Sequence, residues 1–234
     1  MPETKAAPIA SPWGPVRGRA QQRALKREAV LRTAAQLFNE KGYAASTLDE
    51  VAERLGVSKP TVYYYVDSKD AILLECVRAG LEMLQRAIRE VDARGGRAID
   101  KLDAAMRAYV DIVTQDFGML IIRVGEESLP ADARQKVRRM KAGLDMEFRE
   151  LIRQGIAEGS IVPCDPRLAA FTLAGALSWI GRWYRPDGGL DPTEIADHCI
   201  GVLMRGLSRE SVAVPEPAPR PLPAPRRAPR RRTA

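Results

Sequence analysis

The chain has 234 residues, of which 45% are hydrophobic, and its 37 Lys and Arg against 30 Asp and Glu give a net charge of +7. A chain of this length and composition forms one large or two small globular domains. Its longest uncharged run, 168–181, is shorter than a membrane helix, and its N-terminal part has no apolar segment typical of a secretory signal. We therefore expect a cytoplasmic protein with no membrane partner.

Three cysteines and one histidine limit the chemistry available to the chain. Cys76, Cys164 and Cys199 are an odd number at wide spacing, which fits neither a disulfide framework nor a zinc site, and we expect them in the core. Because His198 is the only histidine, the chain lacks the residues needed to build most catalytic and metal centres. We expect no enzymatic activity, no metal and no cofactor.

Positive charge and proline gather at both ends of the chain. Residues 1–28 carry a net charge of +4 and residues 212–234 a net charge of +5, and these two ends hold eleven of the 17 prolines. Such segments offer little apolar surface to offset the entropy of ordering. We expect 1–20 to be a disordered basic arm and 211–234 a disordered Pro/Arg-rich tail. These basic ends either bind along a polyanion or keep the chain in solution.

Helical periodicity between these ends predicts an all-α fold. The T-x-x-E pattern from Thr47 to Glu50 is a capping box, Gly56 marks a turn, and we expect Asp67 and Asp70 to cap the long helix that follows. The helices predicted in the first part of the chain are 23–41, 47–55, 60–66 and 68–94.

The remainder of the chain predicts four or five further helices. Apolar residues recur at helical spacing over 99–113 and 137–156, whereas 168–183 is apolar on every side, which is typical of a fully buried helix. In a domain this small, full burial of one helix suggests that a second chain covers part of it. The last helix, 192–207, offers a matching apolar face.

The segment from Val51 to Tyr65 has the pattern of a helix-turn-helix. Two short helices can cross at a small residue, Ala52, when the turn has a permissive backbone at Gly56. The second helix then projects hydroxyls, an ammonium group and aromatic rings without an acid, which suits the base edges and phosphates of a major groove. These projecting residues are Ser58, Lys59, Thr61, Tyr63 and Tyr64. The alternative is a small helical hairpin with an ordinary polar face.

Lys69 favours the first interpretation. A cation in the first turn of a helix opposes the helix dipole, so we expect an anion such as a phosphate to compensate it. Thr47, at the start of an earlier helix, is placed to direct its hydroxyl and neighbouring amides at another phosphate, although capping alone also explains it.

The residues of 34–43, 47–52 and 56–69 together resemble the DNA-binding domain of the TetR family of bacterial repressors. The resemblance implies a helix-turn-helix DNA-binding domain at 21–67 and a ligand-binding and dimerisation domain at 68–210, in which the last two helices form a homodimer. It also implies a set of operator contacts. Lys59, Pro60, Thr61, Tyr63 and Tyr64 would face the bases of double-stranded DNA, and Thr47, Tyr65 and Lys69 would hold its phosphates.

Residues 179–190 are similar to a TetR subgroup in which several members sense acyl-CoA thioesters, so an acyl-CoA or another small apolar effector is expected. An apolar cavity would take the acyl chain, and Arg182 would meet phosphates. Each apolar candidate can equally be plain core. The candidate ligand-binding residues are Met106, Tyr109, Phe117, Ile121, Phe148, Trp179 and Arg182.

The sequence therefore predicts a homodimeric, ligand-responsive transcriptional regulator of the bacterial nucleoid, in the simplest case a repressor released from a palindromic operator. One alternative is a helical enzyme, for which no convergent acid, base or metal set is found. The other is a nonspecific architectural protein that coats DNA with its basic ends.

Overall fold

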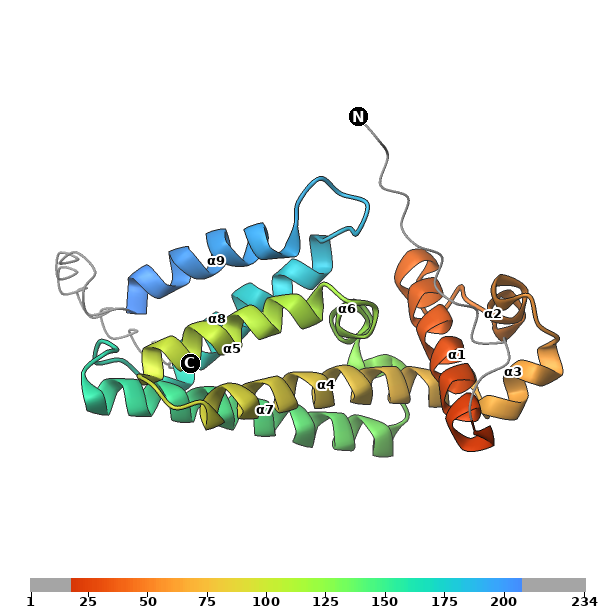
Figure 1. The fold of residues 1–234 in the computed structure, drawn as a ribbon, viewed down its shortest axis with the longest axis horizontal. Coiled ribbons are helices and arrows are strands. Elements are labelled where there is room, and N and C mark those ends of the chain that lie inside the picture. The colour runs from red at the N-terminus through yellow and green to blue at the C-terminus, as the bar shows by residue number, and fades with distance from the viewer. Residues whose placement is uncertain (1–17, 208–234) are drawn as a thin grey trace, which may run out of the picture.

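The computed structural model describes residues 18–207 and is helical throughout that range, which confirms the predicted all-α class (Figure 1). The tail expected at 211–234 and residues 1–17 of the expected arm lie outside the described residues. Within residues 18–207, none of the helices combines the length and the apolar character of a bilayer span. The elements in chain order are α1 (Arg19–Lys41), α2 (Leu48–Leu55), α3 (Lys59–Tyr65), α4 (Lys69–Ala93), α5 (Ala98–Val113), α6 (Asp116–Arg123), a short 3-10 helix (Glu126–Ser128), α7 (Ala131–Glu158), α8 (Pro166–Trp183) and α9 (Pro192–Leu207).

The ends of α2 follow the local signals of the sequence. The Glu50 amide donates to Thr47 Oγ1 at 3.3 Å and the Thr47 amide donates to Glu50 Oε2 at 2.9 Å, so the predicted capping box is present. Gly56 ends the helix in the left-handed conformation, with φ at 65°. A residue with a Cβ adopts this conformation only at a cost, which explains the glycine.

The start of α4 differs from the prediction. The Ser68 hydroxyl accepts the Ala71 amide at 3.0 Å and is the N-cap, so the expectation that Asp67 and Asp70 cap this helix is wrong. A serine directly before the first turn satisfies a free amide without further help. Asp70 instead accepts a hydrogen bond from the Tyr43 hydroxyl.

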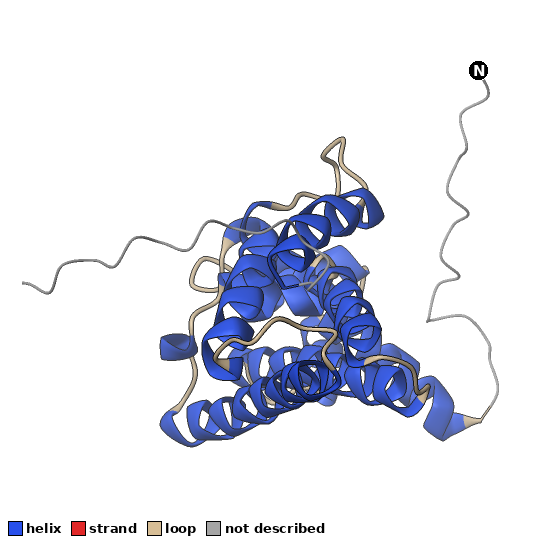
Figure 2. Ribbon diagram, turned by 90° about the vertical axis from the view of Figure 1, so that its left-hand side faces the viewer, coloured by secondary structure: helices blue, strands red, loops and turns tan. Residues whose placement is uncertain are grey.

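The helices form two parts that share the long helix α4. Helices α1 to α3 gather at one end of the molecule, and α4 runs from them into the larger part, which Figure 2 shows from its end (Figures 1 and 2). There α5 is central and packs against α4, α7, α8 and α9, and its Leu102, Met106 and Val110 are fully buried. Helix α6 packs against both α1 and α4, so the two parts meet through more than one element.

Helix α8 is not fully buried within one chain, contrary to the sequence-based expectation. Its Leu177 and Ile180 are buried against the core, but Leu168, Phe171 and Trp179 on the opposite side are 62%, 49% and 64% exposed. The reason is that α8 lies at the outside of the bundle, with α5, α6 and α7 on its inner side only. The apolar pattern around the whole helix therefore leaves an apolar surface that residues 18–207 do not cover.

Candidate nucleic-acid interface

The angle between α2 and α3 is filled by apolar side chains. Val51 and Val62 are completely buried and Ala52 is 4% exposed, while Leu55 packs against them from the end of α2. The turn is fixed by the Val57 amide, which donates to the Ala52 carbonyl at 3.0 Å. Burial of these residues determines which side of α3 faces outward.

The outward side of α3 carries the polar and aromatic groups predicted for it. Tyr63 and Tyr64 are 46% and 65% exposed, and the Ser58 and Thr61 hydroxyls lie 2.8 Å apart. Tyr65 is half-buried and meets the Tyr64 ring edge to face, with centroids 5.0 Å apart. The resulting surface presents hydroxyls and rings without a carboxylate from α3 itself, and Pro60 occupies the first turn, where no intrahelical amide partner is lost.

Lys59 is exposed at the start of α3 and forms an ion pair with Asp49 of α2 at 2.8 Å. The hydrogen bond to Asp49 raises the pKa of Lys59 above its ordinary value, so the ammonium stays charged. Exposed pairs of this kind contribute roughly 0–1 kcal/mol. A phosphate can therefore replace the carboxylate as the partner of Lys59 at little cost.

Thr47 is exposed, but its hydroxyl is used within the capping box. It accepts from the Glu50 amide and lies 3.0 Å from Glu50 Oε2, and the Lys41 ammonium also bonds to that carboxylate. The hydrogen bonds from Lys41 and Thr47 lower the pKa of Glu50 to about 2. This depressed pKa stabilises the fold at pH values above the ordinary 4.5 of glutamate, and the contribution is lost as the pH falls toward 2.

Lys69 finds its compensation inside the protein. Its ammonium donates to the carbonyl oxygens of Tyr43 at 2.6 Å, Ser46 at 2.9 Å and Ala44 at 3.3 Å, and it lies 4.3 Å from the centre of the Tyr43 ring. The argument that its place at a helix start requires an external anion is therefore wrong, because carbonyl dipoles of the α1–α2 loop meet the charge. A phosphate contact at Lys69 stays a prediction that rests on the family resemblance alone.

The predicted ligand-binding residues do not converge on one cavity. Met106 and Phe148 are buried in the core, and Tyr109 lies against Phe148 while its hydroxyl bonds to Ser178 at 2.7 Å. Burial raises the pKa of Tyr109, so this hydroxyl is neutral.

The other candidates lie elsewhere. Phe117 packs under the Arg32 guanidinium, whose central carbon is 5.7 Å from the ring centre. Ile121 lines a cavity of about 10 Å³, which holds no more than one water. Trp179 points out of the bundle from α8. Of these candidates, Arg182 lines an open site of ligand size within the described part of the chain.

That site is a cleft of about 970 Å³ between α1, α6 and the C-terminal end of α8. Arg123, Trp183 and Asn39 also line it, and no sequence pattern singles them out. Arg123 is the only cation in the apolar helix α6, and nothing in the chain's periodicity indicates that this charge meets the far end of α8. The lining residues are Gln36, Asn39, Glu40, Asp116, Met119, Arg123, Arg182, Trp183, Arg185, Pro186 and Asp187.

Three arginines and three acids line this cleft: Arg123, Arg182 and Arg185 beside Glu40, Asp116 and Asp187. Arg123 donates to the backbone carbonyls of Gly181 and Tyr184 and has no carboxylate partner within residues 18–207. Burial lowers the pKa of Arg123, and the like charges of Arg185 and Arg182 lower it further. The mutual repulsion of these three arginines marks a local concentration of positive charge that an anionic ligand would relieve.

The fold and the outward surface of α3 define a class: a DNA-binding protein with an N-terminal helix-turn-helix domain and a larger helical domain. Residues 30–76 match the model of bacterial regulatory proteins of the tetR family, and residues 95–207 match the tetracyclin repressor-like C-terminal domain. The chain belongs to the TetR family of DNA-binding transcriptional regulators, which are not enzymes.

Several relatives match along most of this chain. The TetR-family regulator PfmR of Thermus thermophilus is 30% identical, with 77% of this chain and 99% of PfmR covered and a TM-score of 0.70. The repressor KstR2 of Rhodococcus jostii is 28% identical over 189 residues, which are 78% of this chain and 91% of KstR2. AibR, solved in complex with isovaleryl coenzyme A and operator DNA, is 26% identical, with 76% and 98% covered and a TM-score of 0.67.

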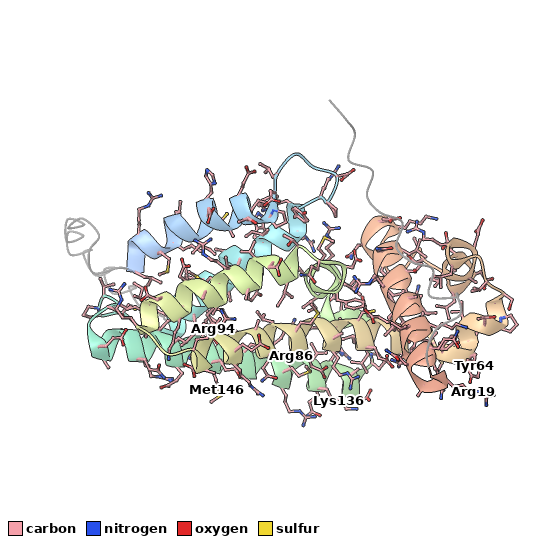
Figure 3. All side chains as sticks on the ribbon, in the orientation of Figure 1. Arg19, Tyr64, Arg86, Arg94, Lys136 and Met146 are labelled. Atoms are coloured by element: carbon pink, nitrogen blue, oxygen red, sulfur yellow. The ribbon has the colours of Figure 1, made fainter. Side chains whose placement is uncertain are left out.

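Replacing Lys69 by Met should loosen the connection between α4 and the α1–α2 loop. The variant keeps the length of the side chain but leaves three carbonyl oxygens without their charged donor, and hydrogen bonds to charged groups contribute roughly 1.5–3 kcal/mol. We expect a loss of stability of that order in urea unfolding and faster amide exchange over 43–47. Lys136→Met, at an exposed position of α7 (Figure 3), is the control and should change neither. Equal effects of the two changes would contradict a structural role for Lys69.

Proposed function

We propose that the protein is a homodimeric repressor that binds a palindromic operator through α3 and is released by a small anionic effector of the acyl-CoA class. The observation that carries the DNA-binding part is the outward face of α3, which combines exposed Tyr63 and Tyr64 with Lys59 and the hydroxyls of Ser58 and Thr61. Such groups suit hydrogen bonds and apolar contacts with base edges. Repression is favoured because KstR2 is named a repressor.

Dimerisation is supported by the uncovered apolar face of α8 and α9. Phe171 and Trp179 on α8 and Val202 on α9 are between 49% and 64% exposed. Exposed apolar patches mark interaction sites, and we propose that these side chains form one. Gly175 and Gly201 lie inside these helices, and a Cβ at either would meet nothing within 4 Å of its own chain. Glycine inside a helix is unfavourable, so close approach of a second chain explains both positions.

A dimer of this kind sets the distance between the two copies of α3. In helix-turn-helix dimers, recognition helices that meet successive turns of the major groove lie about 34–36 Å apart. An effector that binds more tightly to a different arrangement weakens DNA binding by the ratio of its two affinities. Regulation therefore requires a site at which a bound effector can change the angle between α1 to α3 and the larger part of the chain.

The cleft between α1, α6 and α8 is the site we propose for the effector. Its volume of about 970 Å³ is in the range of ligand pockets. Two of its acids are already engaged, since Glu40 pairs with Arg54 and Asp116 accepts from Gln36. Neither Arg182 nor Arg185 forms an ion pair within residues 18–207, so these two arginines are the ones we propose for phosphates. AibR, whose structure holds isovaleryl coenzyme A, gives the chemical class.

Tyr63→Ala should remove operator binding and leave the dimer intact. Loss of a base-edge contact is worth roughly 1–3 kcal/mol, so we expect affinity for an operator selected from genomic DNA to fall about tenfold to a hundredfold per protomer. Gel-shift titration and a sedimentation run on the same sample measure the two properties. An unchanged footprint would reject the role of α3 and with it the proposed function.

Trp179→Asp should convert the dimer into a monomer. A charge in the middle of the apolar face of α8 would be buried without a partner, and interface anchors of this type contribute about 2–4 kcal/mol. Light scattering after size exclusion at micromolar concentration measures the mass. Met146→Asp is the matched control, because Met146 is 67% exposed but lies on α7 (Figure 3). A dimeric Trp179→Asp protein would move the interface elsewhere.

Arg182→Ala should raise the acyl-CoA concentration needed to release the operator by about tenfold or more, since hydrogen bonds to charged groups contribute roughly 1.5–3 kcal/mol. Fluorescence polarisation of operator DNA, titrated with isovaleryl coenzyme A and with the free carboxylic acid, measures release. Arg139→Ala, which removes an exposed cation from α7, should behave as the wild type. Release of Arg182→Ala at the same acyl-CoA concentration as the wild type would exclude the cleft.

The rival function, nonspecific coating of DNA by the basic ends, makes a different prediction. If residues 1–17 and 208–234 were responsible for binding, a chain shortened to residues 18–207 would lose all binding, whereas a protein that binds through α3 would keep its preference for the operator over random duplex.

A further inference from the structure

The first two turns of α1 lie beside the exposed end of α3. The helix begins at Arg19 rather than at the predicted Arg23, so that Arg19 and Arg23, four residues apart, stand on the same side of an ordered helix. Figure 3 shows Arg19 and Tyr64 at the same corner of the molecule. This corner, defined by Arg19, Arg23 and Tyr64, is called the basic corner below.

A direct contact joins the two helices at the basic corner. The central carbon of the Arg23 guanidinium lies 5.4 Å from the centre of the Tyr64 ring, and this ring is in turn held edge to face by Tyr65. A guanidinium over an aromatic face is attracted by the ring quadrupole. Arg23 therefore restricts the position of Tyr64, the most exposed aromatic side chain of α3.

The charge at the basic corner is not compensated by neighbouring carboxylates. The first turn of α1 contains no acidic residue, and neither Arg19 nor Arg23 forms an ion pair within the described part of the chain. Arginines further along the same helix differ, because Arg27 pairs with Glu75 and Arg32 with Glu28. Along α1, arginines without an acidic partner thus gather where the helix approaches α3, and the positive end of the α1 dipole adds to their charge.

We propose that the basic corner is a second DNA-contacting element, in which Arg19 and Arg23 bind backbone phosphates beside the groove that α3 enters and Arg23 positions Tyr64. Long cationic side chains beside a recognition helix bind backbone phosphates and fix the register of the protein on the duplex, but they do not read the base sequence. The inference rests on the proposed function, since it assumes that α3 enters a major groove.

The test compares the full-length wild type with the double variant Arg19→Ala/Arg23→Ala on the selected operator and on a scrambled duplex, over a series of salt concentrations. Each lost phosphate contact lowers the slope of log affinity against log salt by about 0.9. We expect a slope smaller by about 1.8 for each protomer, weaker binding to both duplexes, and an unchanged ratio between them. Arg86→Ala/Arg94→Ala removes the same charge from α4 and from the residue that follows it (Figure 3) and should leave the slope unchanged.

A mutant cycle tests the positioning role of Arg23. If Arg23 acts partly through Tyr64, Arg23→Ala weakens operator binding less in a Tyr64→Ala background than in the wild type, and Tyr64→Phe, which keeps the ring, preserves the full effect. Strictly additive effects would overturn the positioning role.

The outcomes separate this inference from the proposed function. A wild type that selects its operator, with a salt slope that the Arg19→Ala/Arg23→Ala change does not alter, overturns the phosphate contacts of the basic corner alone. A wild type that does not distinguish the operator from the scrambled duplex overturns the proposed function itself.

Discussion

The hydrogen bonds from the Lys69 ammonium to three carbonyl oxygens of the α1–α2 loop are the constraint on which the position of the helix-turn-helix depends. It ties residues 43–46 to the first turn of α4, and the Tyr43 hydroxyl strengthens the same junction by donating to Asp70. Burial raises the pKa of Tyr43 and the neighbouring Asp70 raises it further, so the hydroxyl keeps its proton. Because α2 begins directly after this loop, any tilt of α4 carries α2 and α3 with it.

A second junction connects helices α1 to α3 to the larger part of the molecule through α6. Gln36 and Asn39 of α1 donate to Asp116, while Arg123 at the other end of α6 bonds to the carbonyls that end α8. The proposed effector cleft lies between these two sets of contacts. A ligand that draws the arginines of the cleft toward its phosphates would shift α6 against α1, and by reciprocity operator DNA would weaken its binding.

The sequence predicts what depends on local chemistry. The capping box at Thr47 and the turn at Gly56 need only neighbouring residues, and the outward side of α3 follows once Val51 and Val62 are buried. Interactions across long sequence distances leave no such pattern. Lys69 reads as a misplaced helix charge until its carbonyl partners 23 to 26 residues earlier are known, and Arg123 reads as a surface cation.

Helix α8 carries apolar residues on all sides, so its burial is overestimated from the sequence, yet the pattern still locates an apolar surface. Periodicity alone predicts a fully covered helix, and one chain covers only its inner side, from Leu173 to Ile180. On the outer side, the guanidinium groups of Arg149 and Arg167 lie 5.2 and 5.5 Å from the centre of the Phe171 ring, which stays 49% exposed, and Trp179 is 64% exposed. A two-fold axis through this face would join two rigid units, each with α3 at its far end (Figure 1). Since α4 joins α3 to the larger part of each unit, small rotations at the proposed cleft would become larger displacements at α3.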